Sequence, residues 1–560
     1  MPLQVPVRVA TVELDGFPSE VFCLHSTAVR FPRFRLPSSG WKRRVAQFFI
    51  GLGILFLTLL LLGIAFAVAI QSPQVQRWVF EKSLKWKPPT AADLAAETPG
   101  KPSYNGPLGD ATTVQTAGDF YRTDRIWNVR LGFTQPQWQG IQHTNIPSVR
   151  DWMDPKDHTI QLRNPQASRN GLAGVLGFDF PWSSATVNIG GMEFESAGIR
   201  FKGNGTYLSA LRSYRRPFKL NLSKIRKKQH LAGRTQYNLG NLSADMTCLS
   251  DTLGYEFFRE AGVPAPRTTF ARVFLDIQNQ ETNRLLGLYV MVENPDADWA
   301  REQFGVKNVA LFKPVTYDLF SDLGTDWSAY DGIYDPKVPI SESQKQRVMT
   351  TARWVSTASD EAFAAQAGEF FDLDEVAQFL ACEVLLANYD GFLSNGQNFL
   401  MYLDPRTQRL GFIPWDLDHA WGEFPFIATA EEREQASIGH PWVGRHRLLE
   451  RLMKVPAFQE RYRQQLHRLL ETLFVPERLN HRLDTLAATI RPLVAEWSPD
   501  RLAKLDRAIS SNWDKGPRDG NPSDPNRPVW QLKRFFVTRA ENVRQQLQGK
   551  TQGVVLQRRK

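Results

Sequence analysis

Two short stretches of this chain combine the side chains that a metal–nucleotide site needs. They are Asn388-Tyr-Asp390-Gly-Phe-Leu-Ser-Asn395-Gly-Gln-Asn398 and, after an apolar segment, Pro414-Trp-Asp416-Leu-Asp418. Carboxylate and amide oxygens are the hard ligands that Mg²⁺ and Mn²⁺ prefer. With three carboxylates available, one remains to accept a proton from a hydroxyl group.

The order of these residues is that of protein kinases. In kinases an asparagine follows the catalytic aspartate by five positions, and a metal-binding aspartate comes later in the chain. Asp390, Asn395 and Asp416 have this order. The plainer interpretation is a turn between a helix and a hairpin, because Asn, Asp and Gly form turns in any protein. Spacing alone favours the turn, so the kinase-like interpretation needs support from other residues of the chain.

The whole chain has the composition of an ordinary globular protein. Its 560 residues are 42% hydrophobic and 22% charged, and they suffice for several domains or one large domain with additions. The net charge of +10 comes from local basic clusters. No nucleic-acid module is recognisable, so no nucleic-acid partner is expected. The three cysteines have neither zinc nor disulfide spacing.

An apolar run near the start predicts a membrane anchor. Residues 48–70 are uncharged and mostly apolar over about 23 positions, which suffices for a membrane-spanning helix. The long segment before the run favours an uncleaved anchor over a signal peptide. Basic residues are more frequent before the run than after it, which favours a cytoplasmic N-terminus. We therefore predict a single-pass membrane protein with an extracytoplasmic catalytic domain.

The rest of the chain divides around this run. We predict an N-terminal arm (1–47), the transmembrane helix (48–70), a tether (71–118), one soluble domain (119–548) and a basic tail (549–560). In the soluble domain, apolar runs between turn residues predict strands at 126–131, 185–189, 194–201, 218–222 and 271–275. Apolar periodicity predicts helices at 246–261, 374–387, 445–474, 476–496 and 529–547. The helix over 374–387 leads directly into Asp390.

An ordered set of motifs runs through the soluble domain. The motifs are Gly198-Ile-Arg200-Phe-Lys202-Gly203-Asn204-Gly205-Thr206, Arg215-Arg-Pro-Phe-Lys219-Leu-Asn-Leu, Gly287-Leu-Tyr-Val-Met-Val-Glu293, Asn388-Tyr-Asp390 and Pro414-Trp-Asp416-Leu-Asp418. Together they resemble the spore coat protein H (CotH) kinase family over about residues 119–548. The resemblance implies an α+β, atypical protein-kinase-like two-lobe fold with a helical C-terminal part, here preceded by the transmembrane helix. It also implies transfer of phosphate from ATP to Ser or Thr of surface or exported proteins, with Mg²⁺ or Mn²⁺.

The resemblance implies a role for each candidate residue. Asp390 is matched to the catalytic base, and Asp416 to the metal ligand, with Asp418 completing the metal shell. Asn398 is preferred over Asn395 as the metal-binding amide. The implied nucleotide-binding residues are Lys219, Arg200, Gly203, Asn204, Gly205 and Glu293. The family usually has serines after the asparagine of the glycine turn, whereas this chain has Gly205-Thr206.

Two other functions stay open. A glycoside hydrolase also uses two carboxylates, but it offers no role for Lys219 or the glycine turn. The second alternative is a surface or coat assembly protein with a kinase-like fold and little or no catalysis. The predicted orientation favours it, because ATP is scarce outside the cytoplasm, whereas the presence of Asp390, Asp416 and Lys219 opposes it.

Overall fold

The computed structural model describes residues 104–143, 162–164, 167–513 and 528–559, together with Gly40 and Thr90. The chain divides into two compact units, Met1–Gln76 and Arg77–Lys560, and all elements described below belong to the second unit. The predicted arm, apart from Gly40, and the predicted membrane span lie outside the described residues.

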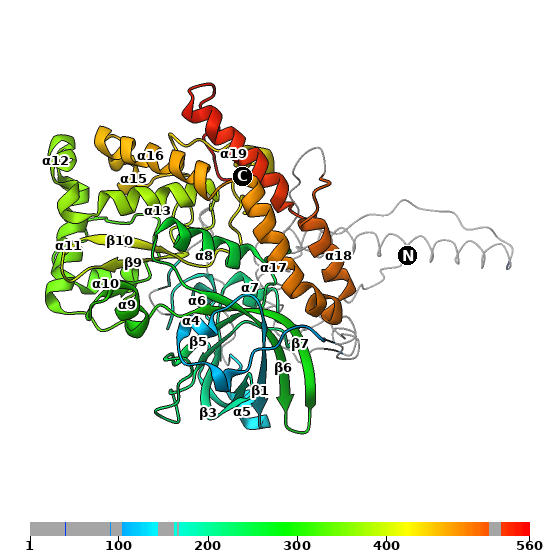
Figure 1. Ribbon diagram of the computed structural model, residues 1–560. Helices are drawn as coiled ribbons and strands as arrows, with labels where there is room; N and C mark the ends of the chain where they lie inside the picture. The colour runs from blue at the N-terminus through cyan, green and yellow to red at the C-terminus, as the bar shows by residue number, and fades with distance from the viewer. Residues whose placement is uncertain are drawn as a thin grey trace. The chain divides into compact units, whose positions relative to one another are not determined.

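A closed barrel of seven strands makes up one half of this unit (Figure 1). In ring order the strands are β1 (Ile126–Phe133), β2 (Ser183–Ile189), β3 (Met192–Phe201), β4 (Phe218–Asn221), β5 (Gln236–Gly240), β7 (Glu281–Glu293) and β6 (Thr268–Ile277). Neighbouring strands are antiparallel, except that β1 runs parallel to β6 and so closes the ring. The barrel therefore presents no open edge.

Alternation along β3 and β4 separates the barrel core from its outer face. Ile199 pairs with Leu220, and Phe201 with Phe218, and all four side chains are buried in the barrel core. Between these pairs, Arg200 lies directly opposite Lys219. Because successive side chains point to opposite faces of a sheet, both cations project away from the barrel interior.

Short helical turns surround the strands, and one longer helix leaves the barrel. The short elements are η1 (Ala111–Thr113), α4 (Ala117–Phe120), α5 (Gln135–Gly140), α6 (Leu172–Val175) and α7 (Gly205–Leu208). The longer helix is α8 (Ser250–Ala261), whose predicted apolar stripe is buried. It ends at Gly262, which has φ 95°, a conformation that glycine adopts without strain.

The other half combines a small sheet with helices. Its antiparallel sheet has the order β10 (Leu410–Pro414), β9 (Phe399–Leu403) and β8 (Ala310–Phe312). The helices are α9 (Ala297–Phe304), α10 (Ser328–Tyr334), α11 (Glu342–Thr357), α12 (Asp360–Phe370), α13 (Leu373–Leu385), α14 (Ala430–Glu434), α15 (Arg447–Leu452), α16 (Pro456–Thr472), α17 (Pro476–Trp497), α18 (Pro499–Ala508) and α19 (Leu532–Leu547).

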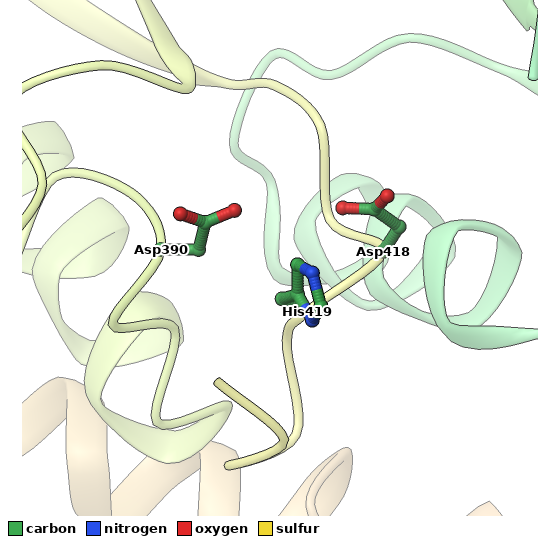
Figure 2. A group of neighbouring side chains, drawn as sticks. All are labelled: Asp390, Asp418 and His419. Carbon is green, nitrogen blue, oxygen red and sulfur yellow. The ribbon is translucent and has the colours of Figure 1, made fainter. Parts of the chain in front are cut away.

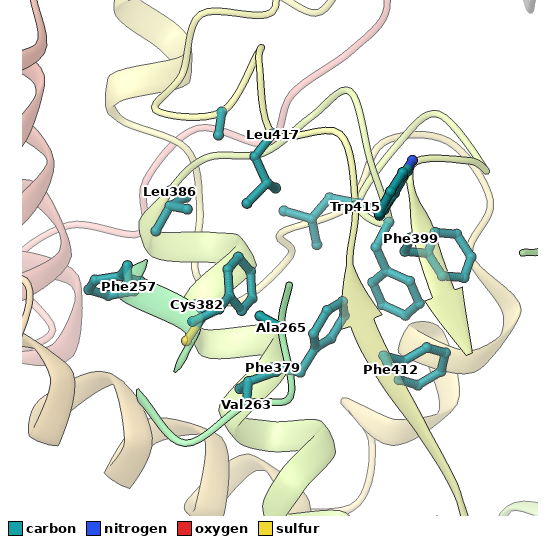
Figure 3. Close-up of a cluster of buried hydrophobic side chains, with 14 of the residues drawn as sticks. Phe257, Val263, Ala265, Phe379, Cys382, Leu386, Phe399, Phe412, Trp415 and Leu417 are labelled. Carbon is teal, nitrogen blue, oxygen red and sulfur yellow. The ribbon is translucent and has the colours of Figure 1, made fainter. Parts of the chain in front are cut away.

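Helix α13 lies at the centre of a second hydrophobic core, separate from the barrel core. Phe379, Cys382 and Leu386, on α13 or just after it, lie between residues of the α8 region, such as Phe257, and residues of the β9–β10 hairpin, such as Phe412 (Figure 3). Burial of the helix on nearly all sides fixes where its last turn ends. The segment that begins at Asn388 therefore starts from a rigid support.

The structure contains the strands and helices given above from the sequence, with one of these helices divided in two. It also adds elements that were not predicted individually, among them β5, β8, α9–α12, α14 and α18. The predicted helix over 445–474 is two helices, α15 and α16, separated before Pro456. A proline lacks the N–H that an interior helical position needs and its ring clashes with the preceding turn, so it starts a helix instead.

The predicted fold class needs correction on two points. The barrel half is a closed seven-stranded ring, because β1 pairs with β6. In the described ranges no helix combines the length and the apolar character needed to cross a membrane. Even α17, with 22 residues, carries charges such as Arg482, Asp484 and Arg491. The structure thus offers no counterpart, among its described residues, of the predicted transmembrane helix.

Candidate metal–nucleotide site

Asp390 lies in the loop that follows α13 and is held by both predicted asparagines. Asn395 donates a hydrogen bond from Nδ2 to Oδ1 of Asp390 (2.7 Å). Asn398 donates from its own Nδ2 to the Asp390 main-chain oxygen (3.0 Å) and to Oδ2 (3.1 Å). The two amides orient the carboxylate, whose residue is only 9% exposed.

The second acidic stretch is anchored by α8. Asp416 has φ 61°, and its main-chain N–H donates to Oη of Tyr255 (2.8 Å). The N–H of Leu417 donates to Oδ1 of Asp251 (2.8 Å). Since Tyr255 and Asp251 both belong to α8, this helix fixes the turn that directs Asp416 and Asp418.

The two stretches meet at a group that could hold a metal ion. Asp390, Asp418 and His419 each offer a ligand atom, and these atoms lie within 4.8 Å of one another. Figure 2 shows the carboxyl groups of Asp390 and Asp418 facing each other, with the imidazole ring near both. The carboxylates of Asp390 and Asp418 fit the oxygen preference of Mg²⁺ or Mn²⁺, whereas Asp416, the predicted metal ligand, is not one of the three residues of this group. The donor set is therefore compatible with the predicted metal.

Burial and mutual repulsion raise the pKa values of these carboxyl groups. Burial, and then the charge of Asp416, raise the pKa of Asp390 to about 8, against the lowering effect of its two amide partners. The same two causes raise the pKa of Asp251 to about 7 and that of Asp418 well above its usual value. A bound cation would relieve this crowding, because an opposite charge favours the ionised form of a carboxyl group.

A cluster of cations faces the acidic group. Lys219 donates from Nζ to Oδ1 of Asn294 (2.9 Å). Burial lowers the pKa of Lys219 to about 7, and the cations that add to this effect are Arg200, Lys337, Lys202 and Lys313. Like charges directly opposite on neighbouring strands are destabilising, as Arg200 and Lys219 are here. Such a cluster is suited to a highly charged anion.

Lys313 brings the helical half into this cationic cluster. It follows β8, and its ammonium lies over the ring of Trp415 (5.5 Å to the centroid). Burial lowers its pKa to about 8, while the nearby Asp416 raises it. Lys219 and Lys313 therefore come from opposite halves of the fold, and Asp416 is close to the second of them.

Two predicted nucleotide-binding features have other contacts in the structure. Glu293 is fully buried, and its Oε1 accepts hydrogen bonds from Arg234 (3.1 Å) and Arg267 (2.6 Å). In the glycine turn, Asn204 accepts from the main-chain N–H of Ala173 (3.1 Å). Gly203 has φ 83° and Gly205 begins the short helix α7. The segment is thus a turn that leads into a short helix.

Sequence reasoning missed several residues of the site. His419 directly follows the predicted Asp418, and its position in the motif was the one signal that could have found it. Asp251 lies on the predicted helix over 246–261, but no local pattern connects it with Leu417. Lys313 and Lys337 occur beside an apolar strand and in a turn, where lysine is common, so nothing in the sequence selects them.

A protein-family model matches much of this unit. Residues 199–543 match the family model described as "CotH kinase protein". The chain belongs to this family. The predicted family resemblance is therefore confirmed, and the match includes Arg200, Lys219, Asp390 and Asp416. It begins inside β3, so that β1 and β2 of the barrel precede it.

A curated CotH relative is inner spore coat protein H of Bacillus subtilis (strain 168). It is 24% identical to this CotH family member over 281 residues, which cover 49% of this chain and 74% of the relative. The relative's name is that of a coat protein. The predicted single-pass membrane localisation and membrane partner are corrected to this extent: the described part of the chain contains no helix that is long and apolar enough to cross a membrane.

Proposed function

We propose that this CotH family member transfers phosphate from ATP to serine or threonine of a protein substrate. The observation that carries the proposal is the charge separation at one site. Asp390, Asp418 and Asp251 form its acidic side, and Lys219 and Lys313 belong to its cationic side. A metal–triphosphate complex has the same separation of charge, with a divalent cation bound to a chain of phosphates.

Asp416 lies where the two sides meet. Its charge raises the pKa of Asp390 on the acidic side and that of Lys313 on the cationic side. Neither the glycosidase alternative nor a simple turn explains why five cations gather beside a carboxylate group. Binding of a single metal–ATP complex would explain both the acidic and the cationic side of the site.

Each residue has a definite task in this proposal. Asp416 and Asp418 would hold Mg²⁺ or Mn²⁺, which neutralises phosphate charge when bound. Lys219 and Lys313 bind phosphate oxygens from opposite halves of the fold. Asp390 accepts the proton of the substrate hydroxyl group. At the same time the hydroxyl oxygen attacks the γ-phosphorus, and the bond between this phosphorus and the β–γ bridging oxygen breaks, releasing ADP. Asn395 and Asn398 keep the Asp390 carboxylate oriented.

A coat or surface assembly protein without catalysis is the second candidate. The name of the Bacillus subtilis relative, an inner spore coat protein, favours it. Assembly alone would require neither the buried carboxylates nor the cationic cluster, both of which cost folding free energy in the absence of a ligand.

The test uses the full chain, γ-labelled ATP, Mg²⁺ or Mn²⁺, and a mixture of candidate acceptor proteins including the chain itself. Asp416→Ala is compared with Asp374→Ala, since Asp374 is an exposed aspartate on α13 that pairs with Arg461. Metal-dependent labelling that is lost only in Asp416→Ala supports the kinase. Failure of the unmodified protein both to bind ATP with metal and to label any acceptor overturns the proposal in favour of the assembly protein.

A further inference from the structure

The segment 549–559, which follows α19, is folded against the chain that follows the site. It pairs with residues 426–437 through main-chain hydrogen bonds: Ala428 N–H to Gln557 O (2.9 Å), Ser437 N–H to Val554 O (2.8 Å) and Val554 N–H to Gln435 O (2.8 Å). Leu556 is 4% exposed and belongs to the hydrophobic core. Although its composition predicts a basic tail, the segment packs as an additional strip beside the chain that follows Asp418 and His419.

Arg558 connects this strip to the loop that carries Asp390. Its Nη2 donates a hydrogen bond to the main-chain oxygen of Ser394 (2.6 Å). Its guanidinium group also lies over the ring of Tyr317, 5.0 Å from the centroid. Tyr317 in turn donates from Oη to Oδ1 of Asn395 (3.4 Å), the residue that donates to the Asp390 carboxylate. A chain of contacts therefore runs from Arg558 to Asp390.

The loop needs support of this kind because it is neither helix nor strand. Its internal hydrogen bonds are few and local, such as Asn395 N–H to Gly391 O (2.9 Å). Gly396 has φ 61°, and its oxygen accepts from the N–H of Thr316 (2.8 Å). Bonds from outside the loop thus fix a conformation that local propensity does not, and small displacements of a catalytic group reduce the rate strongly.

We propose that Arg558 is a positioning residue, which orients Asp390 and Asn395 through the Ser394 carbonyl and the Tyr317 ring. The expected effect of Arg558 on the reaction rate rests on the proposed kinase function. Its expected effect on the conformation of the loop does not. Loss of this charge-assisted hydrogen bond should increase the opening of the loop by about tenfold or more.

The experiment compares Arg558→Ala with Arg559→Ala in the full chain. Arg559 is an exposed neighbour on the same strip, and its Nε donates to Ala428 O (2.6 Å), away from the loop. Hydrogen exchange measured by mass spectrometry reports on peptides covering 391–398. Steady-state kinetics report kcat and the KM for ATP separately. Arg558→Lys and Tyr317→Phe serve as milder variants if Arg558→Ala fails to fold.

The expected result is faster exchange in the loop and a kcat reduced about tenfold in Arg558→Ala, with little change in KM for ATP and partial recovery in Arg558→Lys. Arg559→Ala should behave like the unmodified protein. Equal loop protection in all variants overturns the inference. Loss of loop protection in a protein that never phosphorylates an acceptor leaves the positioning role standing and removes the kinase function instead.

Discussion

Replacing Lys219 by methionine should stabilise the free protein and at the same time abolish its response to ATP. Methionine keeps the length of the side chain and removes the charge that faces Arg200 across the β3–β4 pair. The pKa of Lys219 falls from 10.5 to about 7 on folding. At 1.36 kcal/mol for each tenfold change in proton affinity, folding with a charged Lys219 therefore costs about 5 kcal/mol more than folding with a neutral one.

The expected gain depends on pH in a defined direction. The folded protein loses the Lys219 proton near pH 7, whereas the unfolded chain keeps it up to about pH 10.5. Between these values the unfolded chain binds more protons, so the free energy of unfolding of the unmodified protein rises with pH. At pH 7 the remaining penalty is about 4 kcal/mol, and losing the hydrogen bond to Asn294 offsets about 1 kcal/mol of it.

Lys219→Met should therefore be more stable than the unmodified protein by about 3 kcal/mol at pH 7, and nearly equal to it at pH 9.5. The assay is urea unfolding followed by tryptophan fluorescence at both pH values. A second series contains Mg²⁺ and ATP at about 100 times the dissociation constant, which should stabilise the unmodified protein by about 2.7 kcal/mol and the variant far less. Lys227→Met, at an exposed position after β4, is the control.

Two results together would contradict this prediction: Lys219→Met is less stable than the unmodified protein at pH 7, and its free energy of unfolding has the same pH dependence. Retention of the full ATP-induced stabilisation by the variant would separately contradict the assignment of Lys219 to phosphate binding.

The remaining predictions concern the base and a buried ion pair. Asp390→Asn should still bind ATP with metal but lower kcat by a factor of about 10²–10⁴, as measured by single-turnover phosphorylation; an unchanged kcat would exclude Asp390 as the base. Glu293→Gln should reduce the free energy of unfolding by about 3–5 kcal/mol, because it leaves the buried Arg234 and the partly buried Arg267 beside a neutral group. Glu302→Gln, at a partly exposed position in the same network, should cost less than about 1 kcal/mol in the same urea titration, and equal losses in both variants would contradict this interpretation.

Local patterns predicted the elements and several residues of the site. The strand alternation around Lys219 and the apolar stripe that ends at Gly262 depend on neighbouring residues, and the structure confirms both. The site residues Asp390, Asn395 and Asn398 lie within nine positions, so their order in the sequence predicted that they would meet. The placement of Glu293 was harder, because an acidic residue at a strand end has the same sequence pattern whether it faces a ligand or two arginines.

The sequence by itself determined the residue types at the site, the family resemblance, and the approximate position of several helices and strands, since these depend on composition and short-range periodicity. Only the tertiary structure decided that β1 closes the barrel against β6, that Asp251 holds Leu417, and that Arg558 reaches Ser394. Each of these contacts joins residues more than 100 positions apart. Their geometry follows from how buried faces of elements distant in the sequence pack together in the two hydrophobic cores, which no local propensity encodes.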